Sequence, residues 1–441
     1  MRDSKRQIIR LQLSYKYDII LLRVDNVKCL GWKELMQKKL FCNIDLLIKG
    51  FEGYDNMQIV KFRDTVLDML NKLALLNNRV IFLSRNPEKV NKAKKFCEKR
   101  GYDKFDFISR EVARDFINDH SKDSNAFVMI GTKDVDFQLA VNNKILLIAP
   151  VWLPIEAKVG KYGVQVGNPK QLLQLLSIVV KNENWYAEIN VDSISKCIAL
   201  YDARTMVGGV NENERQMLCN FQNLLKQGAS RNYYQILLYY FLANMTRDKT
   251  FDNITIFGVV PSSSGRINPE LYGFVEQIRF IKKVMLPTGL KDFSMKEQNL
   301  LVRHRSKPQQ HGGSQRGRST IGGTHEFETL CLNGAYKSKI EKLRAEGKLN
   351  ICIFDDYMNY GNGFNAIRCL LEYIGANKII FVSMGLFRQS FYKKDYIITG
   401  NVFAPGYGYE LVNQEILNNY QICFAAKQEI DYLYEVYNPR S

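Results

Sequence analysis

The sequence predicts an α/β protein with two doubly wound parallel-sheet domains joined by a helical segment. Apolar runs of strand length alternate with helical patterns from residue 17 to residue 181, and a second such series starts near residue 254. Between these series the apolar spacing is helical. At 441 residues the chain has room for two or three domains of about 150 residues. We therefore expect domains at 1–182 and 249–441, with a helical connector at 183–248.

Composition supports packed cores and a phosphate-rich or acidic partner. Apolar residues make up 46% of the chain, and the formal net charge is +17 at pH 7. This charge suits small phosphates, a nucleic acid or an acidic protein. A solvated basic surface without such a partner is the equal alternative. Nucleic acid is not favoured, because lysines and arginines are spread over the chain and do not form one stripe. No apolar run approaches the roughly 20 residues of a membrane span, and no signal peptide is visible. We expect a cytoplasmic protein without a membrane segment.

The first domain is predicted from alternating strands and helices, which indicate a parallel sheet with covering helices. The expected strands are Tyr17 to Val24, Arg79 to Leu83, Ala126 to Ile130 and Lys144 to Ile148. The expected helices are Ile59 to Leu76, Pro87 to Arg100, Asp134 to Val141 and Asn168 to Lys181.

Polar residues follow three of these strands: Asp25, Ser84 and the turn from Gly131 to Asp136. The arrangement resembles the haloacid-dehalogenase-like hydrolases. That family attacks phosphate with the first carboxylate of a D-x-D motif, whereas the stretch here reads Arg23-Val24-Asp25. Thr132 also replaces an acid that is usual after Gly131. The resemblance therefore implies the fold without the phosphatase, and we expect this domain to bind, scaffold or dimerise.

The connector is predicted to contain three helices, because its apolar residues recur with helical spacing. We expect these helices over Ile194 to Tyr201, Asn211 to Lys226 and Tyr233 to Met245.

The last domain opens with a buried strand, Ile254 to Val260, followed by Pro261-Ser262-Ser263-Ser264-Gly265-Arg266. Small residues expose backbone amides, and an arginine supplies a planar fork of donors. Ser263, Ser264, Gly265 and Arg266 are therefore candidates for an anion site. An ordinary surface turn is the alternative.

The most informative stretch is ICIFDDYMNYGNG, from Ile351 to Gly363. It combines an apolar strand, two adjacent carboxylates and a glycine-bearing turn that leads into a helix. Asp355 and Asp356 would lie at the carboxyl end of the strand, where ligands bind in open α/β sheets, and the first amides of the helix could bind phosphate. The alternative is a strand-turn-helix whose acids only cap the helix. We expect further strands at Lys378 to Met384 and Tyr396 to Phe403.

This stretch resembles the signature of the phosphoribosyltransferases: an apolar strand, two acids, two aliphatics, two small hydroxyl residues, glycine, any residue, and serine or threonine. The resemblance implies that Asp355 and Asp356 hold the ribose hydroxyls of phosphoribosyl pyrophosphate, directly or through Mg²⁺. It also makes residues 263–266 the pyrophosphate loop. The residues that would surround the 5′-phosphate are Asn359, Tyr360, Gly361, Asn362 and Gly363. The departures from the signature are Tyr357, Asn359, Tyr360 and Gly363.

A basic insertion runs from Arg303 to His325 and contains five lysines or arginines and no acid. Such a composition cannot form a core, so we expect it to be mobile without ligand. Its Arg303-x-Arg305-x-Lys307-x-x-Gln310 pattern is similar to that of competence-linked phosphoribosyltransferase-like proteins. The resemblance implies catalytic roles for Arg303 and Arg305 and substrate binding by Lys307, since these cations would neutralise departing pyrophosphate. An RNA-binding arginine-glycine segment is the alternative.

Together these resemblances imply an enzyme that uses phosphoribosyl pyrophosphate with Mg²⁺ and transfers phosphoribose to an unknown acceptor or to water. Chains that join these two domains look like those of bacterial stress-response and phage-defence loci. That context implies a toxin that disturbs nucleotide metabolism and is controlled by an antitoxin-like protein; a homodimer is also compatible. The alternative function is a catalytically silent regulator that binds nucleotide or RNA through the same loops.

Overall fold

The computed structural model describes residues 38–48, 56–75, 78–120, 126–181, 185–204, 215, 216, 219, 231–245, 248–307, 323–418 and 420–437. These residues confirm the α/β class: they form a six-stranded parallel sheet, a six-stranded mixed sheet and two two-stranded sheets. None of the described helices has the length and apolar character needed to cross a membrane.

The first sheet is parallel throughout and has the strand order β3-β2-β1-β4-β5-β6. Its strands are β1 (Lys39–Asn43), β2 (Arg79–Ser84), β3 (Phe105–Ser109), β4 (Phe127–Ile130), β5 (Leu146–Pro150) and β6 (Val164–Val166). Its helices are α2 (Asp45–Ile48), α3 (Asn56–Leu75), α4 (Pro87–Glu98), α5 (Arg110–Asp119), α6 (Asp134–Asn142), α7 (Ala157–Tyr162) and α8 (Pro169–Lys181).

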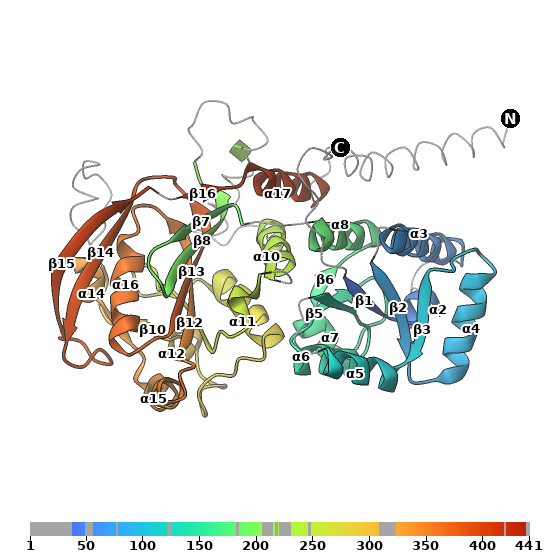
Figure 1. Ribbon diagram of the computed structural model, residues 1–441, viewed down its shortest axis with the longest axis horizontal. Coiled ribbons are helices and arrows are strands. Elements are labelled where there is room, and N and C mark those ends of the chain that lie inside the picture. The colour runs from blue at the N-terminus through green and yellow to red at the C-terminus, as the bar shows by residue number, and fades with distance from the viewer. Residues whose placement is uncertain are drawn as a thin grey trace. The chain divides into compact units, whose positions relative to one another are not determined.

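Helices cover both faces of this sheet. Figure 1 shows α3 and α8 along one face and α5, α6 and α7 along the other. The strand order reverses after β3, and right-handed crossovers on the two sides of β1 place their helices on opposite faces. Phe41, Phe127 and Met129 are fully buried within the core beneath α5. The predicted helices over α3, α4, α6 and α8 are confirmed.

The centre of the first sheet differs from the prediction. Strand β1 lies between β2 and β4, and its Phe41 is in register with Ile81 and Met129. The strand expected over Tyr17 to Val24 lies outside the described residues, as does Asp25. The prediction followed the longer apolar run, whereas a short strand that is buried on both faces needs only a few apolar residues.

The second sheet has the order β16-β7-β8-β13-β12-β9. Its strands are β7 (Ala187–Asn190), β8 (Ser195–Asp202), β9 (Ile256–Val259), β12 (Asn350–Met358), β13 (Lys378–Leu386) and β16 (Gln421–Ile422). The small sheets pair β10 (Leu301–Arg303) with β11 (Leu330–Leu332), and β14 (Phe391–Thr399) with β15 (Gly408–Leu417). The α-helices are α10 (Arg231–Met245), α11 (Pro269–Ile281), α12 (Met295–Gln298), α14 (Thr324–Phe327), α15 (Lys337–Ala345), α16 (Asn362–Tyr373) and α17 (Phe424–Tyr437), and 3₁₀ turns cover Lys249–Phe251 and Gly334–Tyr336.

Two predictions for this part of the chain are wrong. The sheet is mixed, because β7 is antiparallel to β8 and β16 is antiparallel to β7. The helix expected over Ile194 to Tyr201 is strand β8, which lies between β7 and β13. Its run Cys197 to Leu200 is fully buried, and a short continuous apolar run cannot be assigned to helix or strand from periodicity alone. The helix over Tyr233 to Met245 is confirmed as α10, and most of Asn211 to Lys226 lies outside the described residues.

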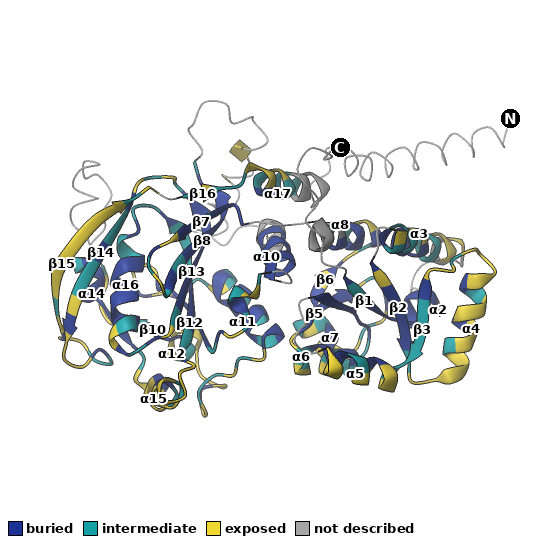
Figure 2. Ribbon diagram, viewed as in Figure 1, coloured by how far each residue is buried: buried dark blue, intermediate teal, exposed yellow. Residues whose placement is uncertain are grey.

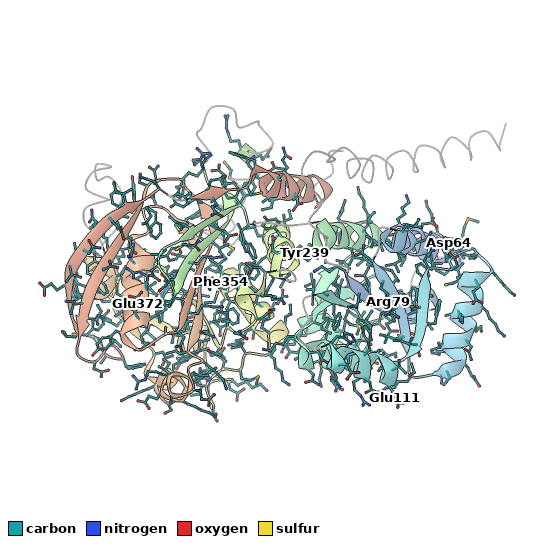
Figure 3. The ribbon with its side chains drawn as sticks, in the orientation of Figure 1. Asp64, Arg79, Glu111, Tyr239, Phe354 and Glu372 are labelled. Atoms are coloured by element: carbon teal, nitrogen blue, oxygen red, sulfur yellow. The ribbon has the colours of Figure 1, made fainter. Side chains whose placement is uncertain are left out.

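Strand β12 and helix α16 form the core of this unit. Phe354 on β12 packs against Phe241, Phe257 and Phe274, and Figure 3 labels it together with Glu372 of α16. Helix α16 is mostly buried, whereas β15 is mostly exposed, as Figure 2 shows. The strand predicted over Ile351 to Phe354 and the helix after it are therefore confirmed, and the strand predicted near Lys378 is β13.

Candidate functional site

The turn between β12 and α16 is shaped by Gly361. This residue caps the helix in a left-handed conformation with φ +81°, which glycine adopts readily. A Cβ at this position would also collide with the ring of Phe391. Both constraints demand glycine and fix the direction in which α16 leaves the strand, with the first amides of the helix at the carboxyl end of β12.

The two adjacent acids on β12 are both half-buried. Asp355 Oδ1 accepts the amide of Asp356 at 2.9 Å, and Asp356 Oδ1 accepts the amide of Tyr357 at 2.8 Å. The side chains of Asp355 and Asp356 also interact with each other, which adds to the upward shift in the pKa of Asp355. Burial, followed by the charges of Asp356 and Glu326, raises the pKa of Asp355 well above its usual range. Asp355 thus favours its neutral form unless a cation lies beside it.

The tyrosines of this stretch lie against neighbouring strands. A Cβ on Gly385 of β13 would lie only 3.0 Å from the Tyr357 ring. The centroids of the Tyr357 and Phe387 rings are 5.3 Å apart. The carbonyl of Tyr360 accepts the amide of Tyr392 on β14 at 3.0 Å, and the two rings are 6.1 Å apart. These contacts attach the turn to β13 and β14.

The loop after β9 begins directly beside the acids, because the amide of Val260 donates to the carbonyl of Phe354 at 2.8 Å. The loop closes on itself: Ser262 N donates to Arg266 O at 2.9 Å, and Gly265 N donates to Ser262 O at 2.9 Å. Gly265 has φ +81°. The side chains of Ser263, Ser264 and Arg266 are exposed.

Arg303 is predicted as a catalytic cation, and the structure places it inside the protein with 3% exposure. Its Nε donates to Ser262 O at 2.9 Å, its Nη2 reaches Pro261 O at 3.3 Å and Glu326 Oε2 at 2.7 Å, and its Nη1 donates to Thr329. Its hydrogen bonds to Pro261 and Ser262 thus fix the loop after β9. Arg305, in contrast, is 60% exposed, and its Nη2 lies 3.4 Å from Glu328 Oε2.

Lys307 joins the same network from the other side. Its amide donates to Ser263 O at 2.7 Å, and its ammonium forms an ion pair with Glu326 Oε1. Burial pushes the pKa of Glu326 upward, but Lys307 and Arg303 outweigh burial, and the net pKa lies below the ordinary value. Residues 308–322, including Gln310, lie outside the described part of the chain.

Glu326 was not predicted as a site residue, yet it links the predicted ones. Its Oε1 lies 3.6 Å from the position that a Cβ on Gly363 would take, and its charge acts on Asp355. The Asp355 carboxyl, the start of α16 and the loop after β9 therefore surround one buried carboxylate. The only sequence signal is the acid in His325-Glu326-Phe327-Glu328, just after a basic insertion.

The acids fit a cation that arrives with a ligand. Across the described residues, no group of three or more histidine, cysteine or acidic side chains is arranged to hold a metal ion. Mg²⁺ in phosphate-binding sites commonly uses one or two carboxylates and takes its other ligands from phosphate and water. Asp355 and Asp356 could supply those carboxylates.

A second polar cluster lies at the carboxyl ends of β1 and β4, where the strand order of the first sheet reverses. Asp136 is fully buried and accepts hydrogen bonds from Asn43 Nδ2 at 2.6 Å, Thr132 N at 3.0 Å, Lys133 N at 2.9 Å and an Nη of Arg110. Four donors saturate this carboxylate.

The neighbouring acid of this cluster, Asp45, is also buried. Its amide donates to Asn43 Oδ1 at 2.9 Å, and its Oδ2 lies 3.4 Å from Thr132 Oγ1. The Lys133 ammonium lies 3.9 Å from Asp45 Oδ2 and 3.5 Å from Glu156 Oε1. The cluster therefore carries its own cations, Arg110 and Lys133.

Comparison of the chain with protein-family models, curated proteins and solved structures found no match.

Proposed function

We propose that the second sheet carries a phosphoribosyl pyrophosphate site and that this part of the chain has a phosphoribosyltransferase-like fold. The observation that supports it best is the Val260 N to Phe354 O bond of 2.8 Å. It places an amide-bearing loop beside an acid-bearing strand that leads into the amino end of α16. Two anion sites thus flank a pair of carboxylates, which matches a sugar that carries phosphate at one end and pyrophosphate at the other.

The residues match the charges that develop during transfer. As the bond from C1 to pyrophosphate stretches, positive charge grows on the ribose ring and negative charge on the leaving oxygens. Asp355 and Asp356 would lie near the ribose, while Arg266, Lys307 and the exposed Arg305 would face pyrophosphate. Arg303 would act as a positioning residue, because its donors hold the carbonyls of the loop.

Mg²⁺ bound to the pyrophosphate would add positive charge at the leaving group, and Asp355 and Asp356 would hold it from the protein side. Such a cation would also favour the ionised form of Asp355, whose pKa is raised in the ligand-free protein. The acceptor of the phosphoribosyl group is not specified by these contacts.

Calorimetric titration with phosphoribosyl pyrophosphate and Mg²⁺, followed by a pyrophosphate-release assay, tests this proposal. We expect release that falls by at least about 100-fold when Asp355→Asn and Asp356→Asn are combined, a typical scale for loss of groups that stabilise a transition state. Asp292→Asn, an exposed acid of the same unit, is the matched control and should retain activity. Binding without release would favour the silent regulator, and no binding would refute the proposal.

For the first sheet we propose a dehalogenase-like fold without phosphotransfer. In that family the attacking carboxylate stands at the end of the central strand, and β1 ends in Asn43. An amide is no substitute for a carboxylate nucleophile. The residues also do not fit a bound Mg²⁺, because Asp136 is saturated by donors and Lys133 lies beside Asp45.

A further inference from the structure

Glu326 is a buried carboxylate whose position is set by the packing of α14 on α16. The residue before α14, Gly323, lies so close to α16 that a Cβ there would be 2.9 Å from the Ala366 Cβ. Its amide donates to the Tyr396 hydroxyl at 3.0 Å. Phe327 stacks on Tyr409 with ring centroids 4.7 Å apart. These contacts hold Glu326 beside the first turn of α16.

The carboxylate of Glu326 forms ion pairs with two cations next to the loop after β9 and offsets part of their charge. Oε2 takes Arg303 Nη2 at 2.7 Å, and Oε1 takes the ammonium of Lys307. The two cations differ in how many other groups hold their side chains in place. Arg303 also donates to Pro261, Ser262 and Thr329, so it is fixed. The Lys307 side chain is 23% exposed, and among the described residues the acid that pairs with it is Glu326.

Glu326 also lies beside the first turn of α16, whose amides could bind a phosphate. Its Oε1 is 3.6 Å from the position that a Cβ on Gly363 would take, which is an ordinary van der Waals distance. Negative groups are favoured at the amino end of a helix. A phosphate and the Glu326 carboxylate would therefore compete for the same positive surroundings and repel each other.

We propose that Glu326 is an internal counter-ion of the phosphate site, which an incoming phosphate must displace from Lys307. This role rests on the proposed function, because it assumes that the ligand's phosphate binds beside α16 and the loop after β9. Lys307 changes partner from Glu326 to the ligand, while Arg303 keeps Glu326 in place. The carboxylate thus lowers the affinity for any anion and reduces the positive charge of the empty site.

Titration of the full-length protein with inorganic pyrophosphate in the absence of Mg²⁺ tests this role. Glu326→Gln keeps the shape and the acceptor oxygen but removes the charge, so we expect pyrophosphate to bind roughly three- to tenfold more tightly. Glu341→Gln on α15 is the control, because this acid is exposed and lies outside the network of Arg303, Lys307 and the loop after β9. It should change the affinity by less than about twofold.

Lys307→Met gives a second measurement that does not depend on the folding of Glu326→Gln. It leaves Glu326 with fewer cations, so we expect pyrophosphate to bind several-fold more weakly than to the exposed-lysine control Lys291→Met. If the wild type binds pyrophosphate and Glu326→Gln binds it with equal or weaker affinity, the role of Glu326 is overturned. Equal affinities of Lys307→Met and Lys291→Met would also overturn this role. Neither result would refute the proposed function. If neither the wild type nor any variant binds pyrophosphate, the proposed function falls as well.

Discussion

The carboxyl edges of the two large sheets carry similar residue types but use them differently. At the edge of the first sheet, Asp136 is saturated by four donors, and Lys133 lies between two acids. At the edge of the second sheet, Ser263, Ser264 and Arg266 are exposed, and burial raises the pKa of Asp355. The first edge satisfies its own charges. At the second edge, burial and neighbouring acids act on Asp355, and acids with such shifted pKa values are frequent at ligand-binding sites.

The difference teaches that an aspartate at the end of a strand is not by itself a sign of function. What separates the two edges is hydrogen-bond saturation. A buried carboxylate with several donors stabilises the fold, and removing it leaves buried donors and charges unpaired. A carboxyl that is buried beside other acids weakens the fold and gains when a cation binds.

The largest effect should come from Asp136→Asn. The amide cannot accept from all four donors and leaves the charge of Arg110 uncompensated. We therefore expect the free energy of unfolding of the protein to fall by about 3 kcal/mol. Chemical denaturation measures this. Asp115→Asn on α5, where the acid is 65% exposed, should change it by less than about 0.5 kcal/mol. Equal losses of stability in Asp136→Asn and Asp115→Asn would contradict the saturation of Asp136 by its four donors.

Asn43→Asp should be the next largest. It restores the acid that a phosphatase of the proposed fold would need, but it places a second carboxylate 2.6 Å from Asp136. We expect a loss of about 2 kcal/mol of stability near pH 8, partly regained as the pH falls and the pair binds a proton. Hydrolysis of p-nitrophenyl phosphate should stay at the wild-type level. A gain of Mg²⁺-dependent hydrolysis would show that this edge is open.

Asp355→Asn should have the opposite sign and a smaller size. Because the folded state raises the pKa of Asp355, wild-type stability decreases as the pH rises from the unfolded pKa toward the folded one. The variant lacks this loss, so we expect it to be about 1 kcal/mol more stable than the wild type near pH 8. The gain should shrink toward pH 4. Thermal unfolding at both pH values checks the sign, and a gain that is larger at pH 4 would contradict it.

A further contrast in stability separates Arg303 from Arg305, the first two arginines of the basic insertion. Arg305→Lys should leave stability within about 0.5 kcal/mol, because this side chain is 60% exposed. Arg303→Lys should cost about 2 kcal/mol, since a lysine cannot replace a guanidinium bonded to several acceptors. Thermal unfolding of the pair measures the contrast. Equal losses would show that Arg303 is not the support of the loop after β9.

The acid-bearing turn could be predicted because its signals are local. An apolar run, two acids and a glycine lie within thirteen residues, and Gly361 has the backbone conformation that such a turn demands. Strand β1, which ends in Asn43, and Asp45 at the start of α2 are not evident from the sequence. Five residues offer little periodicity, and a longer apolar run lies upstream. Strand β8 was read as a helix because it is buried on both faces.

The role of Glu326 could not be predicted, because it depends on partners that are distant in sequence. Arg303 and Lys307 lie 23 and 19 residues away from it, and only the fold brings them to one carboxylate. The same pairing explains why Arg303 and Arg305, two residues apart, differ so much in exposure. Arg303 lies on the same side of β10 as the buried Leu301, whereas Arg305 lies beyond the end of this strand. No sequence pattern shows where such a short strand ends or which side of it faces the core.

Gly361 also limits how the protein can vary. The Phe391 ring fills the space that any side chain at this position would need, and β14 is bonded to the turn through Tyr392 and Tyr360. The first amides of α16 and the ribbon of β14 and β15 are therefore coupled through this turn. Saturation mutagenesis should find position 361 intolerant of every replacement, while a smaller residue at 391 would relieve the collision but leave the left-handed backbone requirement in force.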